Sequence, residues 1–146
     1  MQDTRPKTRI FKRKNVIFEV GSNYYDENDV KRCVTNITAL VEGLEQWVLI
    51  SIPDKSKGVT PAAARTAVNL LKQALHNNCA ALLVLTSNTS AKIFAHALEE
   101  YGLEGKLVCS ESIMELMEKA ESILGDKALF MDGDLHNKAA REVMSN

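Results

Sequence analysis

The sequence predicts a single α/β domain with a mostly parallel central sheet, about four helices and an antiparallel hairpin at its N-terminal end. Three observations support this prediction. Short apolar runs of strand length alternate with stretches in which apolar residues recur every three or four positions. The connections between these segments are short. The 146 residues are enough to bury one core, and their 45% apolar and 25% charged content is typical of a globular protein.

The overall composition excludes several classes of protein. The net charge of -1 gives no strong field to attract nucleic acid, and no apolar run approaches the roughly 18 residues that a membrane span needs. The N-terminus lacks the apolar middle of a secretory signal. We therefore expect a cytoplasmic protein that has no membrane span and binds no nucleic acid.

Motifs that mark common reactive sites are also missing. The sequence contains no GxxxxGK[ST] or GxGxxG loop for phosphates, no HExxH or CxxC, and no GxSxG elbow. Cys33, Cys79 and Cys109 are too far apart for a disulfide framework or a clustered zinc site, so we expect them to be reduced and mostly buried. We expect no metal, no cofactor and no enzymatic activity.

The two ends of the chain differ from its middle. Six basic residues and only one acid fall within residues 1–14, which we predict to form an edge strand, because lysine on exposed edges discourages sheet-to-sheet pairing. Residues 15–125 form the predicted α/β domain. Periodicity weakens over residues 126–146, a C-terminal extension that could hold a short helix near 135–143.

The first predicted strand and helix of the domain follow directly. "NVIFEVGS" has the β-branched and aromatic residues of a strand that ends at Gly21, and "SNYYDEND" then supplies a turn. Apolar residues at helical spacing predict a helix over 27–44, which Gly43 ends. The acids that precede it and open it suit a helix N-terminus better than a reactive acid cluster; they are Asp26, Glu27 and Asp29.

The next strand and helix have clear boundaries. "QWVLISI" is a buried strand that Pro53 closes, because proline donates no hydrogen bond to a ladder. Thr60 is a good N-cap and Pro61 suits the first helical position. The helix then runs to His76.

The same unit recurs twice in the second half of the domain. "CAALLVLTS" is a buried strand, followed by a helix over about 89–101 with Gly102 as its cap. "KLVC" is a short strand. Ser110 is the expected cap of the last helix, whose inner face carries Ile113, Met117, Ala120 and Leu124.

Polar residues follow two neighbouring strands at the edge where open α/β sheets place their sites. We expect the loop 53–60 and the "TSN" of residues 86–88 to share this edge. Phosphorylation in the loop would add about two negative charges at a helix N-terminus, although structural capping alone also explains Thr60. The candidates for partner binding or phosphorylation are Asp54, Ser56, Gly58, Thr60, Thr86 and Ser87.

Four stretches of residues 15–124 resemble a known family: "WVLISIPD", "GVTPAA", "CAALLVLTS" and "CSESIMELMEKAESIL". They are similar to the STAS domain of anti-sigma-factor antagonists and sulfate transporters, and within it to the SpoIIAA-like branch. The resemblance implies a non-enzymatic regulatory module that binds a protein partner through the 53–60 loop and the following helix. In antagonist members a kinase phosphorylates the serine before the glycine. Lys57 stands there in this chain, which leaves Ser56 and Thr60 as the nearest acceptors.

The SpoIIAA-like branch also resembles small lipid-carrier domains, which implies an alternative function. The chain would then carry a small nonpolar ligand in a pocket beneath the helices. Plain core packing explains the same side chains, and the sequence also leaves a homo-oligomer open. The residues expected to border such a pocket are Ile93, Phe94, Met114 and Met117.

Overall fold

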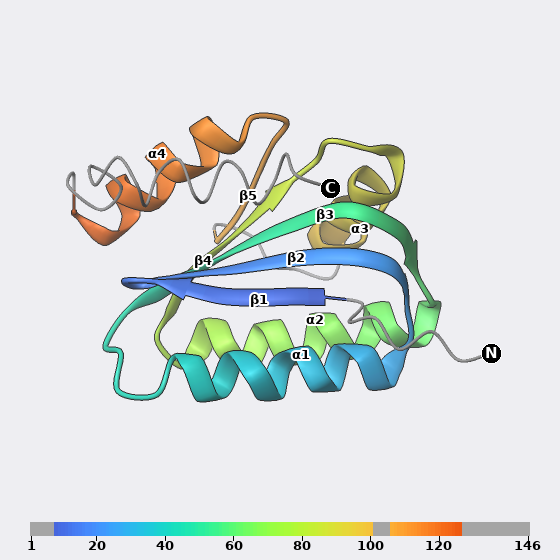
Figure 1. The fold of residues 1–146 in the computed structure, drawn as a ribbon, viewed down its shortest axis with the longest axis horizontal. Coiled ribbons are helices and arrows are strands. Elements are labelled where there is room, and N and C mark those ends of the chain that lie inside the picture. Colours follow the sequence, from blue (N-terminus) through green and yellow to red (C-terminus); the bar gives the residue numbers. More distant parts are fainter. Residues whose placement is uncertain (1–7, 101–105, 127–146) are drawn as a thin grey trace.

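The computed structural model describes residues 8–100 and 106–126. Five strands form one sheet in the order of the chain: β1 (Thr8–Arg13), β2 (Val16–Tyr25), β3 (Trp47–Val59), β4 (Cys79–Leu85) and β5 (Leu107–Ser110). Strand β1 is antiparallel to β2, and all other neighbours are parallel. The helices are α1 (Glu27–Leu40), α2 (Pro61–His76), α3 (Thr89–Glu100) and α4 (Ile113–Leu124) (Figure 1). The predicted fold class is confirmed.

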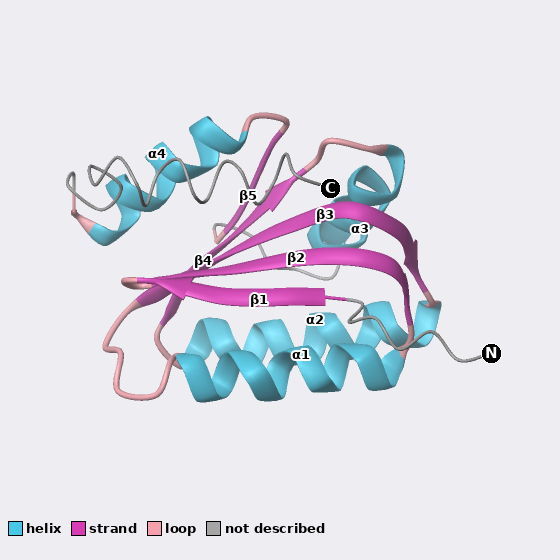
Figure 2. Ribbon diagram, viewed as in Figure 1, coloured by secondary structure: helices cyan, strands magenta, loops and turns pink. Residues whose placement is uncertain are grey.

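Helices cover both faces of the sheet, which explains the continuous apolar runs in its central strands (Figure 2). On one face, helix α4 packs on β3, β4 and β5. Its inner residues share a core layer with alternate residues of the strands, among them Phe18, Ile50 and Leu83. On the other face lie α1, α2 and α3, which pack on the intervening residues, such as Leu49 and Leu82. The core is therefore divided by the sheet into two layers.

Helix α1 ends earlier than its apolar pattern predicts. The pattern indicates residues 27–44, whereas the helix stops at Leu40 with Val41 as its C-cap. Gly43 has a φ of 86°, a left-handed conformation that favours glycine and that turns the chain toward β3. The apolar residues just after the helix still pack on the core because they lie in this turn against Trp47.

Strands β2 and β3 are longer than predicted. The expected ends at Gly21 and Pro53 are wrong, because β2 continues to Tyr25 and β3 to Val59. Val20 pairs with Ile52 and Ser22 with Lys55, so that Gly21 lies opposite two residues of β3. Pro53 falls in this irregularity, where a residue without an N–H is tolerated. The predicted loop 53–60 is therefore strand up to Val59, and only Thr60 separates β3 from α2.

The last helix has a different cap from the one predicted. Ser112, not Ser110, is the N-cap of α4, and its hydroxyl accepts a hydrogen bond from the Glu115 N–H at 3.2 Å. The Ser110 hydroxyl instead accepts from the Ser112 N–H and donates to the Glu115 carboxylate. Gly125, with a φ of 67°, ends the helix. The expected cap Gly102 and the expected helix near 135–143 lie outside the described residues.

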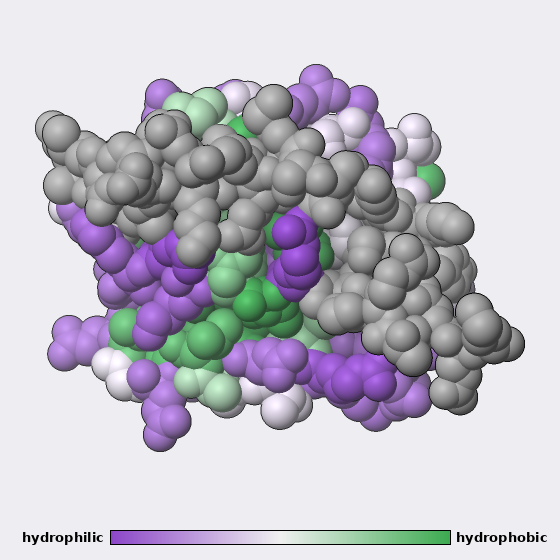
Figure 3. All heavy atoms as spheres, viewed as in Figure 1, coloured by the Kyte–Doolittle hydropathy of each residue, from purple (hydrophilic) through white to green (hydrophobic). Residues whose placement is uncertain are grey.

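Strand β1 forms one end of the described sheet and packs against α1. The Phe11 ring stacks on Phe18 with centroids 5.0 Å apart, and the Arg13 guanidinium lies 4.8 Å from the Phe11 centroid. The space-filling view shows apolar residues in the seam between β1 and α1, with hydrophilic residues on both sides (Figure 3). No helix within residues 8–100 and 106–126 combines the length and the apolar character needed to cross a membrane.

Candidate functional site at the carboxyl end of the sheet

All four helices begin at the carboxyl end of the parallel strands, and α1, α2 and α3 follow the neighbouring strands β2, β3 and β4. We call this region the carboxyl-end rim and define it as residues 52–59 of β3 together with the N-terminal segments of α1, α2 and α3, which are residues 26–29, 60–63 and 86–91. The first four N–H groups of a helix have no partner within it, so such a rim presents hydrogen-bond donors and partial positive charge. All six candidates for partner binding or phosphorylation belong to this rim.

Thr60 is the N-cap of α2, as the sequence predicts. Its backbone is extended, and its hydroxyl accepts a hydrogen bond from the Ala63 N–H at 3.0 Å. Pro61 occupies the first helical turn, where its missing N–H costs nothing. Thr60 is half-buried. Its hydroxyl already has a structural role because it accepts the Ala63 N–H.

We expect Thr60→Ala to lower the free energy of unfolding by about 1 kcal/mol, because the Ala63 N–H loses its acceptor. Thr60→Ser keeps the hydroxyl and should lie close to the wild type. Urea denaturation followed by circular dichroism measures both variants. Equal stability of the alanine and serine variants would show that the cap contributes nothing.

The two hydroxyl candidates that follow β4 differ in accessibility. Thr86 is 8% exposed, and its N–H donates to the Ser110 carbonyl at 2.8 Å, which fixes it between β4 and β5. Ser87 is exposed. Asn88 accepts a hydrogen bond from the Ala91 N–H at 2.8 Å through its side chain and so caps the start of α3. Of the pair, Ser87 is the hydroxyl that a partner or a kinase could reach.

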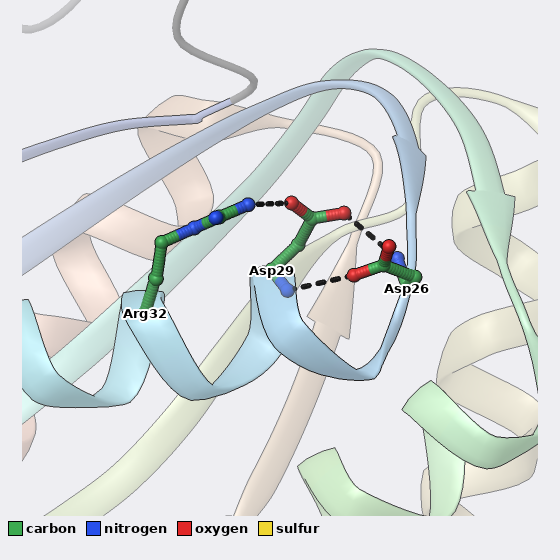
Figure 4. A network of polar contacts seen from close by, with 3 residues as sticks. All are labelled: Asp26, Asp29 and Arg32. Carbon is green, nitrogen blue, oxygen red and sulfur yellow. Dashed lines mark hydrogen bonds and ion pairs between the residues drawn. The ribbon is translucent and has the colours of Figure 1, made fainter.

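The acids at the start of α1 form a capping box (Figure 4). The Asp29 N–H donates to the Asp26 carboxylate, and the Asp26 N–H donates to the Asp29 carboxylate, both at 2.9 Å. Asp29 is 3% exposed, and the Arg32 guanidinium pairs with its other oxygen. The expectation that these acids serve the helix terminus is confirmed, whereas the role of Arg32 was not predicted.

Helices α1 and α2 are tied together beside the rim. The Thr66 hydroxyl donates to the Glu27 carboxylate at 3.1 Å, a contact between residues 39 positions apart. Both side chains belong to the first two turns of their helices. This contact links the N-terminal turns of α1 and α2.

A polar pair that the sequence analysis did not identify lies on the sheet below the rim. The Ser51 hydroxyl donates to the Glu19 carboxylate at 3.0 Å, and the two residues face each other across β2 and β3. Burial raises the pKa of Glu19 above its ordinary value of 4.5, and the Ser51 hydrogen bond offsets part of this increase. The sequence indicates this pair only through the single polar residue that interrupts each of the apolar runs "VIFEV" and "VLISI".

The remaining rim candidates belong to the extension of β3. Ser56 pairs with Asn23 and Gly58 with Tyr24, while Asp54 lies in the irregularity opposite Gly21. The structure therefore places Asp54, Ser56 and Gly58 on a strand that leads directly to Thr60. These residues belong to the same rim as Thr60 and Ser87.

The four nonpolar candidates do not come together around one pocket. Phe94 packs with the layer under α1, α2 and α3, whereas Met117 belongs to the layer under α4 on the opposite face of the sheet. Met117 is 1% exposed, whereas Ile93 is 66% and Met114 is 42% exposed. The structure thus distributes these side chains over two core layers and the surface.

The three cysteines are in no disulfide, and the burial of one of them differs from the expectation. Cys33 and Cys79 are buried as expected, while Cys109 is exposed. Burial raises the pKa of Cys79 to about 11, and the pKa of Cys109 is raised by partial burial and by the nearby Glu99 carboxylate. Since the thiolate is the nucleophile, neither shift favours cysteine chemistry.

Comparisons with known proteins agree on the architecture. Neither a protein-family model nor a curated protein matches the chain. Among solved structures, a DUF3478 family protein from Shewanella loihica with a SpoIIAA-like fold matches with a TM-score of 0.57 and 9% identity, over 77% of this chain and 91% of that one. This chain has a SpoIIAA-like fold. A variant of RsbS from Moorella thermoacetica matches with a TM-score of 0.58 and 12% identity, over 81% and 97% of the two chains.

The matches cover nearly the whole of both solved proteins, so the SpoIIAA-like fold accounts for most of this chain. At these identities the likeness concerns the fold alone. The fold likeness that the sequence analysis inferred from four short stretches is confirmed. Within this SpoIIAA-like fold, the carboxyl-end rim is the region that gathers the predicted polar candidates.

Proposed function

We propose that this chain is a non-enzymatic regulatory module that binds a protein partner at its carboxyl-end rim. The observation that carries the proposal is the extension of β3. Its pairing with β4 ends at Ser51 and Val84, whereas its pairing with β2 continues to Val59. Among the described residues, the edge of residues 52–59 that faces away from β2 pairs with no strand (Figure 1).

Such an edge is suited to strand addition. An extended segment of a partner adds a strand through main-chain hydrogen bonds, and side chains beside the edge determine which segment fits. Here the neighbouring groups are the exposed Ser87 and the start of α2. The SpoIIAA-like fold is also the fold of RsbS, a STAS domain protein, which supports a regulatory role.

The same geometry supports regulation by phosphorylation. Ser56 lies on the open extension of β3, and Thr60 caps the helix that follows it. A phosphate on Thr60 would bring about two negative charges to the N-terminus of α2, and a phosphate on Ser56 would bring them to the open edge of β3. In either place the added charge would repel an acidic or tightly packed partner. We propose that phosphorylation at Ser56 or Thr60 releases the partner.

Site-specific photo-crosslinking tests the proposed surface. A photoreactive amino acid is placed at Ser87 on the rim, at Lys119 on the outer side of α4, or at Glu45 at the amino end of the sheet; all three positions are exposed. We expect the partner protein to crosslink from Ser87 but not from Lys119 or Glu45. Amide hydrogen exchange with the purified partner should then slow in residues 52–59, because added strand bonds protect their N–H groups.

The affinity of the purified partner for three variants tests the regulatory step. Thr60→Glu and Ser56→Glu should weaken the partner's affinity by about tenfold or more, whereas Thr60→Ser should leave it unchanged. Equal crosslinking from Ser87 and Lys119, or slowed exchange only outside residues 52–59, would reject the rim. Unchanged affinity in both glutamate variants would reject the phosphorylation step alone.

A further inference from the structure

A second candidate site lies at the opposite end of the sheet from the rim. A depression of about 490 Å³ opens between the end of α1, the turn into β3 and the turn between α2 and β4. Trp47, 4% exposed, contributes to its wall at the first position of β3. The residues that line it are Thr35, Thr38, Ala39, Val41, Glu42, Gly43, Leu44, Trp47, Asn77 and Asn78.

Several hydrogen-bonding groups of this depression have acceptor capacity left. The hydroxyls of Thr35 and Thr38 donate to the carbonyls of Lys31 and Val34 at 3.0 and 2.7 Å, so each has only its acceptor capacity left. The Asn77 side chain donates to the Gln73 carbonyl at 2.9 Å and keeps its own oxygen available. A ligand that donates hydrogen bonds fits this lining.

Within the lining itself, the electrostatics favour a positive charge. Glu42 is the only charged residue of the lining. Helices α1 and α2 both end here, and a helix C-terminus carries unpaired carbonyls and about half a negative charge. The last turn of α1 contains no basic residue, and that of α2 contains only His76, which does not line the depression.

A lysine of this chain already donates a hydrogen bond to a carbonyl beside the depression. The Lys12 ammonium donates to the Leu40 carbonyl at 3.3 Å, at the end of α1. Neither residue lines the depression. The Lys106 ammonium likewise donates to the Leu75 carbonyl in the last turn of α2 at 3.1 Å. Both helix ends thus accept an ammonium group, and the carbonyls that do so lie outside the lining.

We infer that this depression binds a small organic cation, namely a primary ammonium that carries an apolar group. The ammonium would donate to the Glu42 carboxylate and to the threonine oxygens. The apolar group would pack on Val41, Leu44 and Trp47. The inference is independent of the proposed function, because it concerns the other end of the sheet.

Three probes of similar size but different charge test the inference: 2-phenylethylamine, 2-phenylethanol and 3-phenylpropionate. Trp47 is the only tryptophan, so its fluorescence reports on the depression without a label. Amide shifts of Leu44 and Asn78 in two-dimensional NMR spectra provide a second readout. We expect saturable changes with the amine and binding at least roughly fivefold weaker with the alcohol and the acid.

Matched variants separate a specific site from general attraction. Glu42→Gln should weaken the amine roughly fivefold, whereas Glu45→Gln, the same change at an exposed residue outside the lining, should not. Ala39→Lys adds a competing ammonium at an exposed lining position and should abolish binding. The inference is overturned if the alcohol or the acid binds as well as the amine, if the two glutamine variants behave alike, or if millimolar amine shifts neither signal.

Discussion

Met117→Ala is expected to lower the free energy of unfolding by about 2–5 kcal/mol. Met117 is 1% exposed and packs with Leu116 and Ala120 of α4 against Ile50 and Leu83 of the sheet. Truncation removes apolar contacts and leaves a cavity that the rigid strands cannot close. Urea denaturation followed by circular dichroism gives the difference from the wild type.

Met114→Ala is the matched control, because it makes the same chemical change on the same helix at a residue that is 42% exposed. Its effect should stay within about 0.5 kcal/mol. Similar effects of the two variants, or a near-neutral Met117→Ala, would contradict the assignment of Met117 to the core. Such a result would return Met117 to the alternative in which it borders a ligand pocket.

Glu19→Gln is expected to remove a loss of stability that the wild type shows as the pH rises. Burial raises the pKa of Glu19 in the folded protein above 4.5, the ordinary value that applies to the unfolded chain. At a pH between 4.5 and the pKa of the folded protein, the folded state therefore holds a proton that the unfolded state has released. The contribution of Glu19 is therefore full below pH 4.5 and is lost as the pH rises through the folded pKa. The slope reaches at most about 1.4 kcal/mol per pH unit for one proton.

Glutamine keeps a carbonyl acceptor for the Ser51 hydroxyl but does not titrate. Urea denaturation at a series of pH values from about 5 to 8 should show wild type and variant diverging as the pH increases, with the variant more stable. Glu118→Gln makes the same change at an exposed residue of α4 and should run parallel to the wild type. Parallel curves for Glu19→Gln would refute the buried titration.

Local chemistry explains which boundaries the sequence could predict. Thr60 and Pro61 act within one helical turn, so the start of α2 was predicted at the correct residue. Pro53 led to a wrong strand end because its effect is not decided locally. Whether a proline ends a strand depends on the partner strand, and the extension of β2 that pairs with β3 lies about 30 residues away in the chain.

The candidate site was predicted only in part, because some of its features follow from sequence order and others depend on strand register. Sequence order places the "TSN" of residues 86–88 and Thr60 at one end of the sheet, which the structure confirms. The contact between Glu19 and Ser51 depends on the register of two strands, which no local pattern encodes. Helical periodicity identified the inner side of α4, whereas for α3 it included Ile93, which is 66% exposed. It also could not show that these helices cover opposite faces, so Phe94 and Met117 were grouped together although they lie in different core layers.

The strand order has a consequence for how the protein is made. Because the five strands lie side by side in the order of synthesis, each new strand adds next to the one just completed, and early assembly needs few long loops. Helix α4 is the last described element to leave the ribosome. Until it arrives, the apolar row that includes Ile50 and Leu83 lacks the helix that packs on it, and a nascent chain arrested before residue 113 is the form most in need of a chaperone.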